Sequence, residues 1–463
     1  MNVIAREIVD VSPARAPRRA GLALLTLCLA VLIAQVDTAV VNLAVRPIGA
    51  YFRAGVGAMQ WVVDSYNLVY AVLLLTGGLL ADLYGRRFIF MAGAITFTLA
   101  SLVCAFAPSV VVLIGGRAIA GLGAAFIIPA SLAIIRVVWQ EPTARGRALG
   151  IWAACNGVAF AVGPTLGGLL IHHFGWPSVF LLVVPLGIAT FILAPLAIPE
   201  SRDPANRRFD APAQMLGMVA LGSLAFAAIE SHQSWRLALV ALAPAVIALI
   251  LFVTVERLGG PTALVPLDIF RIREFRGAAV ATAGMTFGMY GTIFLVPLTW
   301  QSTGRMDPVE AGLALMPMAL VFVVVSPFSG TMVRKFGARA TTSGGVFVIS
   351  LGLLLIGTSA GWPGILLPEI GLALTGLGMG LATGPLMGIA VGAVAASRSG
   401  TASSLINVAR MAGATIGVAG LGSAFAFAGG GETGLCAAML FGGVVQFACA
   451  AFAWSAGSTS EQD

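Results

Sequence analysis

Three charged side chains lie inside stretches of sequence that are otherwise apolar: Asp37, Asp64 and Arg117. A charged group at the centre of a membrane helix costs about 2.5–3.5 kcal/mol on insertion scales. Burial favours the protonated form of a carboxylate, whereas a nearby cation favours the charged form. If Arg117 moves relative to Asp37 or Asp64, the proton affinity of that carboxylate changes, so that it can bind and release a proton. The residues therefore predict proton coupling or the binding of a charged solute; a static structural ion pair is the alternative.

Further polar residues accompany Asp37. Gln35, Thr38 and Asn42 follow one another at the spacing i, i+3 and i+7. Residues at this spacing share one face of a helix. We expect this face to look into the protein rather than into lipid, and Asn42 to belong to the same site as Asp37.

The elements that carry these residues are membrane helices. The chain has 463 residues, of which 59% are hydrophobic and 10% are charged, whereas a soluble protein carries about 25% charged residues. A helix needs roughly 20 apolar residues to cross the hydrocarbon, and the runs are too long and continuous for the strands of a β-barrel. An all-α integral membrane protein with fourteen transmembrane helices is predicted, at about 20–45, 60–84, 87–107, 110–135, 147–171, 178–198, 212–230, 236–256, 277–300, 309–333, 340–358, 364–390, 401–426 and 434–456.

The distribution of basic residues predicts the orientation. Of the 26 Lys and Arg, 20 fall on the side that holds the N-terminus and four on the opposite side. Cytoplasmic loops carry the excess of Lys and Arg, so both termini should be cytoplasmic. The net charge of +7 then follows from topology, and no nucleic-acid partner is expected. The five cysteines show neither metal-ligand nor disulfide spacing.

This topology also gives the depth of the three charges. Asp37, Asp64 and Arg117 lie roughly 12, 6 and 10 Å from the outer ends of their helices, at 1.5 Å per residue. We therefore expect all three to meet in the outer half of one bundle.

An internal repeat predicts the domain organisation. GLLADLYGRR (78–87) and GTMVRKFGAR (330–339) share Gly, Gly and Arg at an offset of 252 residues, as in transporters built from parallel repeats. The expected parts are a cytoplasmic basic tail (1–19), an N-terminal six-helix bundle (20–199), a linker with two extra helices (200–276), a C-terminal six-helix bundle (277–456) and a cytoplasmic tail (457–463). The single lysine, Lys335, follows Arg334 and no glycine, so an ATP-binding loop is excluded and transport must use a gradient.

The motifs resemble those of the major facilitator superfamily, and within it the fourteen-helix drug:proton antiporters. GLLADLYGRR is similar to the signature loop after helix 2, although the second copy has Arg334 in place of Asp82. LIGGRAIAGLGAA (113–125) is similar to the arginine-bearing motif of helix 4, and GVAFAVGPTLGG (157–168) to the antiporter motif of helix 5. VDTAVVNLAV is similar to the helix 1 motif of the fourteen-helix branch. The resemblance extends to methylenomycin-type resistance exporters.

Two groups of residues are candidates for conformational change. We expect a latch in this loop, since glycine permits close backbone approach and positive φ, and Asp82 can cap a helix or form an ion pair. Its residues are Gly78, Asp82, Gly85, Arg86 and Arg87. In helix 5 the glycines permit close helix packing and Pro164 removes a backbone hydrogen bond. This second group consists of Gly157, Gly163, Pro164, Gly167 and Gly168.

Three other charges are weaker candidates. Glu230 ends the seventh predicted helix and Glu369 opens the twelfth, and either could assist proton or substrate binding. Arg410 is expected to extend to the cytoplasmic end of the thirteenth helix.

The predicted function is proton-coupled export of lipophilic or cationic drugs or antibiotics across the plasma (inner) membrane by a monomer that alternates access. A transporter of the same fold for a physiological metabolite, either exporter or symporter, is the alternative. A receptor or a membrane-embedded enzyme fits less well, because there is little soluble sequence and no catalytic cluster. We expect no enzyme activity, no cofactor and no metal site.

Overall fold

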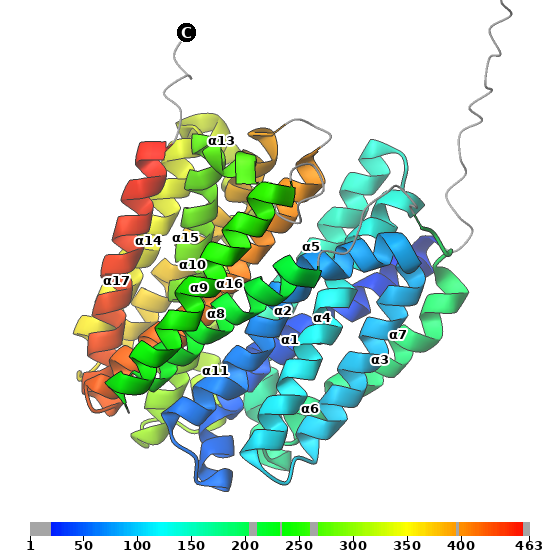
Figure 1. Cartoon of the computed structure of the whole chain (residues 1–463). Coiled ribbons are helices and arrows are strands. Elements are labelled where there is room, and N and C mark those ends of the chain that lie inside the picture. The colour runs from blue at the N-terminus through cyan, green and yellow to red at the C-terminus, as the bar shows by residue number, and fades with distance from the viewer. Residues whose placement is uncertain (1–19, 203–210, 232–233, 260–266, 395–397, 457–463) are drawn as a thin grey trace, which may run out of the picture.

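The computed structural model describes residues 20–202, 211–231, 234–259, 267–394 and 398–456, and within them every regular element is a helix (Figure 1). The first half contains α1 (Ala20–Phe52), α2 (Val56–Tyr84), α3 (Arg86–Ala105), α4 (Val110–Val138), α5 (Pro142–Phe174), α6 (Ser178–Leu181) and α7 (Val183–Ala197). Next come α8 (Ala211–Glu230), α9 (Trp235–Gly259) and the 3₁₀ helix η2 (Leu267–Arg271). The second half contains α10 (Arg273–Ser302), α11 (Pro308–Ala314), α12 (Met316–Val325), η3 (Ser326–Phe328), α13 (Ser329–Phe336), α14 (Ala338–Thr358), α15 (Leu366–Gly392), α16 (Ser399–Phe427) and α17 (Gly431–Ala456).

Thirteen spans among the described residues are long and apolar enough to cross a membrane, which confirms the predicted class of multi-pass membrane protein. The helix α5 is 33 residues long but is not one of the thirteen. The count of fourteen transmembrane helices therefore stays a prediction.

Proline explains two breaks that the sequence did not predict. The span expected at 178–198 is divided after Leu181, and Pro185 lies one turn beyond this break. The span expected at 309–333 is divided into α11, α12, η3 and α13, with Pro317 and Pro327 near the start of new segments. Proline has no N–H to donate to the preceding turn, so the helix changes direction there.

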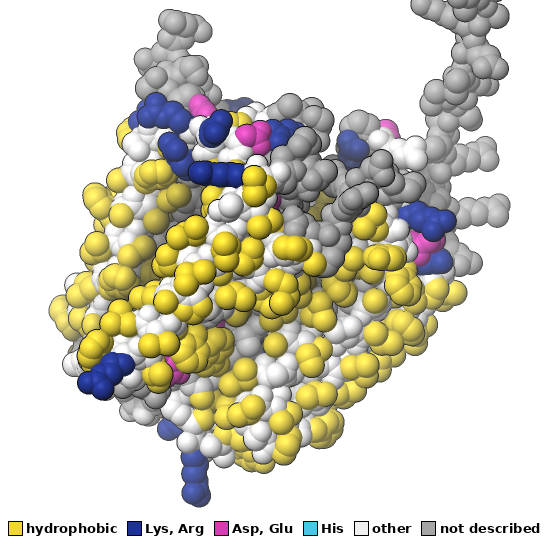
Figure 2. Space-filling model, viewed as in Figure 1, with side chains coloured by type: hydrophobic (Ala, Val, Ile, Leu, Met, Phe, Trp, Pro, Cys, Tyr) yellow, Lys and Arg dark blue, Asp and Glu magenta, His cyan; other side chains and the backbone are white. Residues whose placement is uncertain are grey.

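The first residues of α1 and the last residues of α17 lie toward the same side of the bundle (Figure 1). We call this side the near side and the opposite side the far side. Helices of the first and second halves approach each other at the far side and diverge toward the near side. Figure 2 shows a broad hydrophobic surface between the two sides, with Lys and Arg gathered mainly at the near side. Such a band fits a bilayer whose basic loops lie on one side.

The helices α8 and α9 pack against each other, and α8 also packs against α2 and α16. Gln214 of α8 donates to the carbonyl of Val72, and Ser423 of α16 donates to that of Ala228. Of the two extra helices, α8 thus contacts one helix of each half. The domain boundaries given above stay our interpretation of this arrangement.

Candidate functional site

A buried ion pair joins Asp37 on α1 to Arg117 on α4 in the N-terminal half. Nη1 of Arg117 donates to Oδ2 of Asp37 at 2.5 Å, and its Nε donates to the carbonyl of Val62 at 3.0 Å. Both residues are 1% exposed, and the guanidinium lies 4.6 Å from the centre of the Tyr66 ring. Burying two charges is costly unless they are well paired. This geometry holds them in direct contact.

Asp64 lies apart from this ion pair, contrary to the expected meeting of three charges. Its side chain on α2 is fully buried, and neither carboxylate oxygen has a hydrogen-bond partner among the described residues. Nε of Arg117 donates to the backbone carbonyl of Val62, two residues before Asp64, and no bond joins the guanidinium to the Asp64 carboxylate. Similar depth along two helices was therefore not sufficient to bring Asp64 to Arg117.

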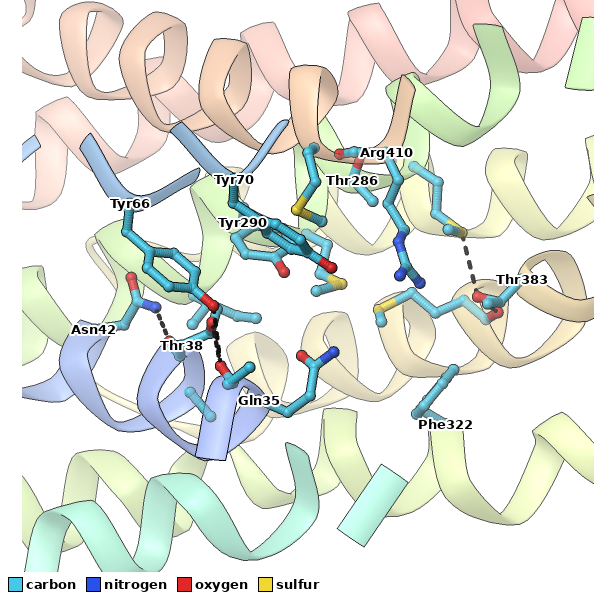
Figure 3. Close-up of a pocket in the computed structure, with 17 residues that line it drawn as sticks. Gln35, Thr38, Asn42, Tyr66, Tyr70, Thr286, Tyr290, Phe322, Thr383 and Arg410 are labelled. Carbon is cyan, nitrogen blue, oxygen red and sulfur yellow. Dashed lines mark hydrogen bonds between the residues drawn. The ribbon is translucent and has the colours of Figure 1, made fainter. Parts of the chain in front are cut away.

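A cavity of about 100 Å³ lies between the two halves (Figure 3). The halves contribute α1 and α2 on one side and α10, α12, α15 and α16 on the other. The lining side chains are Ala34, Gln35, Thr38, Ala39, Asn42, Tyr66, Tyr70, Met285, Thr286, Met289, Tyr290, Ile293, Phe322, Met379, Thr383, Arg410 and Met411.

The predicted polar face of α1 looks into this cavity, but Asp37 is not part of the lining. Gln35, Thr38 and Asn42 line the cavity. Nδ2 of Asn42 donates to the carbonyl of Thr38 at 2.7 Å, while its Oδ1 has no partner among the described residues. Because successive helix residues are about 100° apart, Asp37 lies on the side of α1 that faces α4. One face of α1 therefore lines the cavity with Gln35, Thr38 and Asn42, and another face carries Asp37, which pairs with Arg117.

Sequence reasoning missed the cavity residues of the other helices, above all Arg410. We expected its side chain at the near end of its helix. Arg410 lies 11 residues beyond Ser399, where α16 begins, which places it about 16 Å along the axis. Its side chain points into the cavity (Figure 3). An arginine this far inside an apolar helix was the available signal. The tyrosines and methionines gave none, since such residues are common in any core.

The loop between α2 and α3 contains the predicted intraloop ion pair and one contact that was not predicted. Asp82 accepts from Arg86 at 2.8 Å. Gly85 has a φ of 119°, which glycine adopts readily. Glu200, beyond α7, accepts from the backbone N–H groups of Arg87 and Phe88, each at 3.1 Å. A carboxylate at this position caps α3 and complements its dipole.

Gly78 lies one turn before Asp82 and makes only an ordinary contact, because a Cβ there would lie 3.5 Å from Pro129. Its neighbourhood therefore gives no sign of the close approach that we expected of the latch residues.

The small residues of α5 pack against α1 of the same half and, on the far side, against α11 of the other half. A Cβ at Gly163 or Gly167 would come within 2.6 Å of Ala39 or Val40 on α1. A Cβ at Gly168 would come within 2.5 Å of the carbonyl oxygen of Pro308 on α11. The carbonyl of Pro164 approaches Gly312 of α11 in the same way.

Two glutamines extend this contact between the halves on the far side. Gln60 donates to the carbonyls of Val418 and Ala419, at 3.2 and 3.0 Å. Gln301 donates to the carbonyl of Leu43 at 3.3 Å.

Three predicted candidates lie outside these sites. Glu230 is the last residue of α8, Glu369 is in the first turn of α15, and neither lines the cavity. Gly157 belongs to α5, but its surroundings lie outside the described residues.

Together, the helical membrane fold and the cavity between two bundles define a membrane transporter. The sequence profile of the Major Facilitator Superfamily matches residues 27–418, and the chain belongs to this family. Among similar proteins, Multidrug resistance protein Stp of Mycobacterium tuberculosis (strain CDC 1551 / Oshkosh) is 37% identical over 84% of this chain and 73% of its own length. Methylenomycin A resistance protein of Bacillus subtilis (strain 168) is 33% identical over 86% of this chain and 85% of its own.

A solved structure has the same fold. The crystal structure of a D-xylose-proton symporter superposes with a TM-score of 0.67, at 14% identity, and covers 96% of this chain and 99% of that one. This likeness is one of fold alone.

Proposed function

We propose that this protein is a proton-coupled antiporter that exports lipophilic drugs or antibiotics across the plasma membrane by alternating access. The observation that carries the proposal is the cavity between the two halves, together with a buried carboxylate–guanidinium pair on another face of α1, one of the helices that line the cavity. The relatives named as multidrug and methylenomycin resistance proteins support the drug class. The reaction moves solutes and protons without making a covalent bond, and a single chain contains both sites.

The orientation that we propose places the near side, with both termini, in the cytoplasm. The gathering of Lys and Arg at this side supports it (Figure 2). The far side is then external, and its close contacts between α5 and α11 correspond to a state closed to the outside.

The two carboxylates have different surroundings and so different assignments. Asp37 is charge-paired with Arg117, whereas Asp64 is buried without a partner among the described residues. An isolated buried charge is costly, so we assign the transported proton to Asp64 in this state. In the alternate state Asp64 would be charged, after losing its proton to the near side.

The energy for export would come from the proton gradient. One proton moving inward supplies about 2.3 kcal/mol per 100 mV and about 1.4 kcal/mol per pH unit. The loop between α2 and α3 would move when the bundles move. We assign its residues Asp82, Arg86 and Arg87 to a latch that is formed in this state.

Apolar and aromatic side chains dominate the cavity, which favours a lipophilic drug over a polar metabolite such as a sugar. A sugar site would have to place hydrogen-bonding groups around every hydroxyl to replace water, whereas methionine and aromatic side chains cover much of this cavity.

The test is uptake into inverted membrane vesicles with an imposed pH gradient, screened across lipophilic compounds. We expect accumulation that stops when a protonophore collapses the gradient. Equal accumulation after collapse would exclude proton antiport. Empty-vector vesicles control for passive partition into lipid.

A further inference from the structure

The charge on the described lining of the cavity between the halves is positive. Arg410 is the charged residue among its described lining side chains, and no Asp or Glu is among them. The sequence of α5, Pro142–Phe174, contains neither acid, so the parts of this helix whose surroundings are not described add no carboxylate. The two deep carboxylates, Asp37 and Asp64, do not line the cavity.

Unlike Arg117, Arg410 has no counter-ion in the part of the chain that the structure describes. Among the described residues Arg410 forms no ion pair, and its Nε is buried without a hydrogen-bond partner. Its backbone carbonyl accepts from Thr286 of α10, which fixes α16 against α10 at this level. An unpaired guanidinium inside a membrane protein is costly unless something compensates it. A bound anion would do so.

Two further hydrogen-bond donors face the same space. Tyr70 and Tyr290, one from each half, point into the cavity beside Arg410 (Figure 3). Their hydroxyls make no hydrogen bond to another described residue. Tyrosine hydroxyls and a guanidinium together match an oxyanion, because each donates to it.

The rest of the lining suits an apolar ring system. Met285, Met289, Met379 and Met411 surround the space with flexible thioethers, which make favourable contacts with aromatic groups. Phe322 and the tyrosine rings add aromatic surface. The cavity thus offers apolar walls and a positively charged, donor-rich end.

We propose that the cavity binds lipophilic organic anions, in particular aromatic monoanions, with Arg410 as the counter-charge and Tyr70 and Tyr290 as donors. This inference rests on the proposed function for its role in transport, and it replaces the cationic class of substrate expected from the sequence. A cationic drug meets repulsion from Arg410 and finds no carboxylate among the described lining residues.

The test uses three fluorescent probes that share one ring: 1-naphthoate, 1-naphthylmethanol and 1-naphthylmethylammonium. Binding to the purified full-length protein in nanodiscs of neutral lipid is measured at pH 7 without a proton gradient. We expect naphthoate to bind at least about tenfold more tightly than the ammonium compound, as for one hydrogen bond between charged groups. The alcohol should fall between them. Equal binding of the three probes, or tighter binding of the cation, overturns the proposal.

Three variants of the same residue assign the preference to Arg410. Arg410→Gln should remove it, Arg410→Lys should keep most of it, and Arg410→Glu should reverse it in favour of the ammonium compound. Arg236→Gln is the matched control, because Arg236 stacks on Trp235 at the far end of α9 and does not line the cavity. An unchanged preference in folded Arg410→Gln contradicts the assignment. If that variant does not fold, the wild-type preference and the Lys and Glu variants decide.

Transport separates this inference from the proposed function. Gradient-driven export of the neutral or cationic probe, unaffected by Arg410→Gln, would leave the antiporter standing and remove the anion site. Tight, Arg410-dependent binding of naphthoate without any gradient-driven transport would support the anion site and contradict the antiporter function.

Discussion

The two halves of this transporter share a repeat but carry different charges. The N-terminal half buries Asp37, Asp64 and Arg117 away from the cavity, whereas the C-terminal half places Arg410 in its wall. A parallel difference separates the two signature loops. Gly85 and Gly337 both have positive φ, at 119° and 81°, but only the first loop has the Asp82–Arg86 ion pair. The two loops share a backbone shape, while in the mechanism proposed here the charges divide proton handling from substrate recognition.

The largest effect on stability and transport is expected from a substitution that leaves Arg117 of the N-terminal half without its counter-ion. Asp37→Asn should abolish gradient-driven export and cost about 3–5 kcal/mol of stability, because it leaves Arg117 buried without its counter-ion. Thermal unfolding in detergent and vesicle transport measure the two effects. The double variant Asp37→Asn/Arg117→Met should regain stability without regaining transport. A fully active Asp37→Asn would remove this residue from coupling.

The second carboxylate should separate transport from stability. Asp64→Asn should also abolish proton-coupled export, but its stability should change far less than that of Asp37→Asn, since Asp64 has no ionic partner among the described residues. The same two assays apply, with Asp64→Glu as the variant that keeps a proton-binding group. Normal coupling in Asp64→Asn would show that the proton travels by another residue.

A smaller effect is expected at the contact between the halves. Gly168→Ala places a methyl group against the Pro308 carbonyl, and overpacking costs about 1–3 kcal/mol. Each 1.4 kcal/mol shifts the equilibrium tenfold away from this far-closed state. Spin labels at Phe174→Cys and Trp362→Cys, in a background without the five native cysteines, should report a longer mean distance. Gly150→Ala is the control on the same helix, because a Cβ there meets nothing within 4 Å; an equal response of both variants would refute the contact model.

Helix capping can be compared through Glu200, which caps α3, and Glu369, which lies in the first turn of α15. Glu200→Gln weakens the cap of α3 and should lower stability by roughly 1 kcal/mol. Glu369→Gln, in the first turn of α15, removes a carboxylate that has no hydrogen bond or ion pair among the described residues and should change stability less. Thermal unfolding of both variants, compared with the wild type, decides between these expectations.

The smallest effect concerns an exposed ion pair at the near side of the C-terminal half. Arg398 contacts Asp268 through two hydrogen bonds, of 2.5 and 3.0 Å, and these bonds lower the pKa of the Asp268 carboxyl. A lowered folded-state pKa gives stability that is present above the unfolded pKa of about 3.9 and is lost as pH falls through the folded pKa.

The wild type should therefore exceed Asp268→Asn slightly in melting temperature at pH 7, and the difference should disappear in strongly acidic buffer. Added salt should reduce it as well. A difference that persists unchanged in acid would point to a cause other than this ion pair.

The fold was predictable from sequence because hydrophobic length and basic loops determine membrane helices strongly. The predicted segments agree with the observed helices closely, as for 212–230 against Ala211–Glu230. The site was predictable only in part. Asp37 and Arg117 were found because charge in an apolar run is rare, whereas the isolation of Asp64 depends on helix rotation, which residue depth along an axis does not specify. Glu200 was missed because its partners are backbone N–H groups distant in sequence.

Arg410 has a consequence for the electrical work of transport. An antiporter that exchanges one inward proton for one outward monovalent cation moves no net charge. If the exported solute is a monovalent anion, the same cycle moves two positive charges inward. The membrane potential then contributes about 4.6 kcal/mol per 100 mV, at about 2.3 kcal/mol for each charge. A cavity built around an arginine would thus let the voltage drive export even where the pH gradient is small.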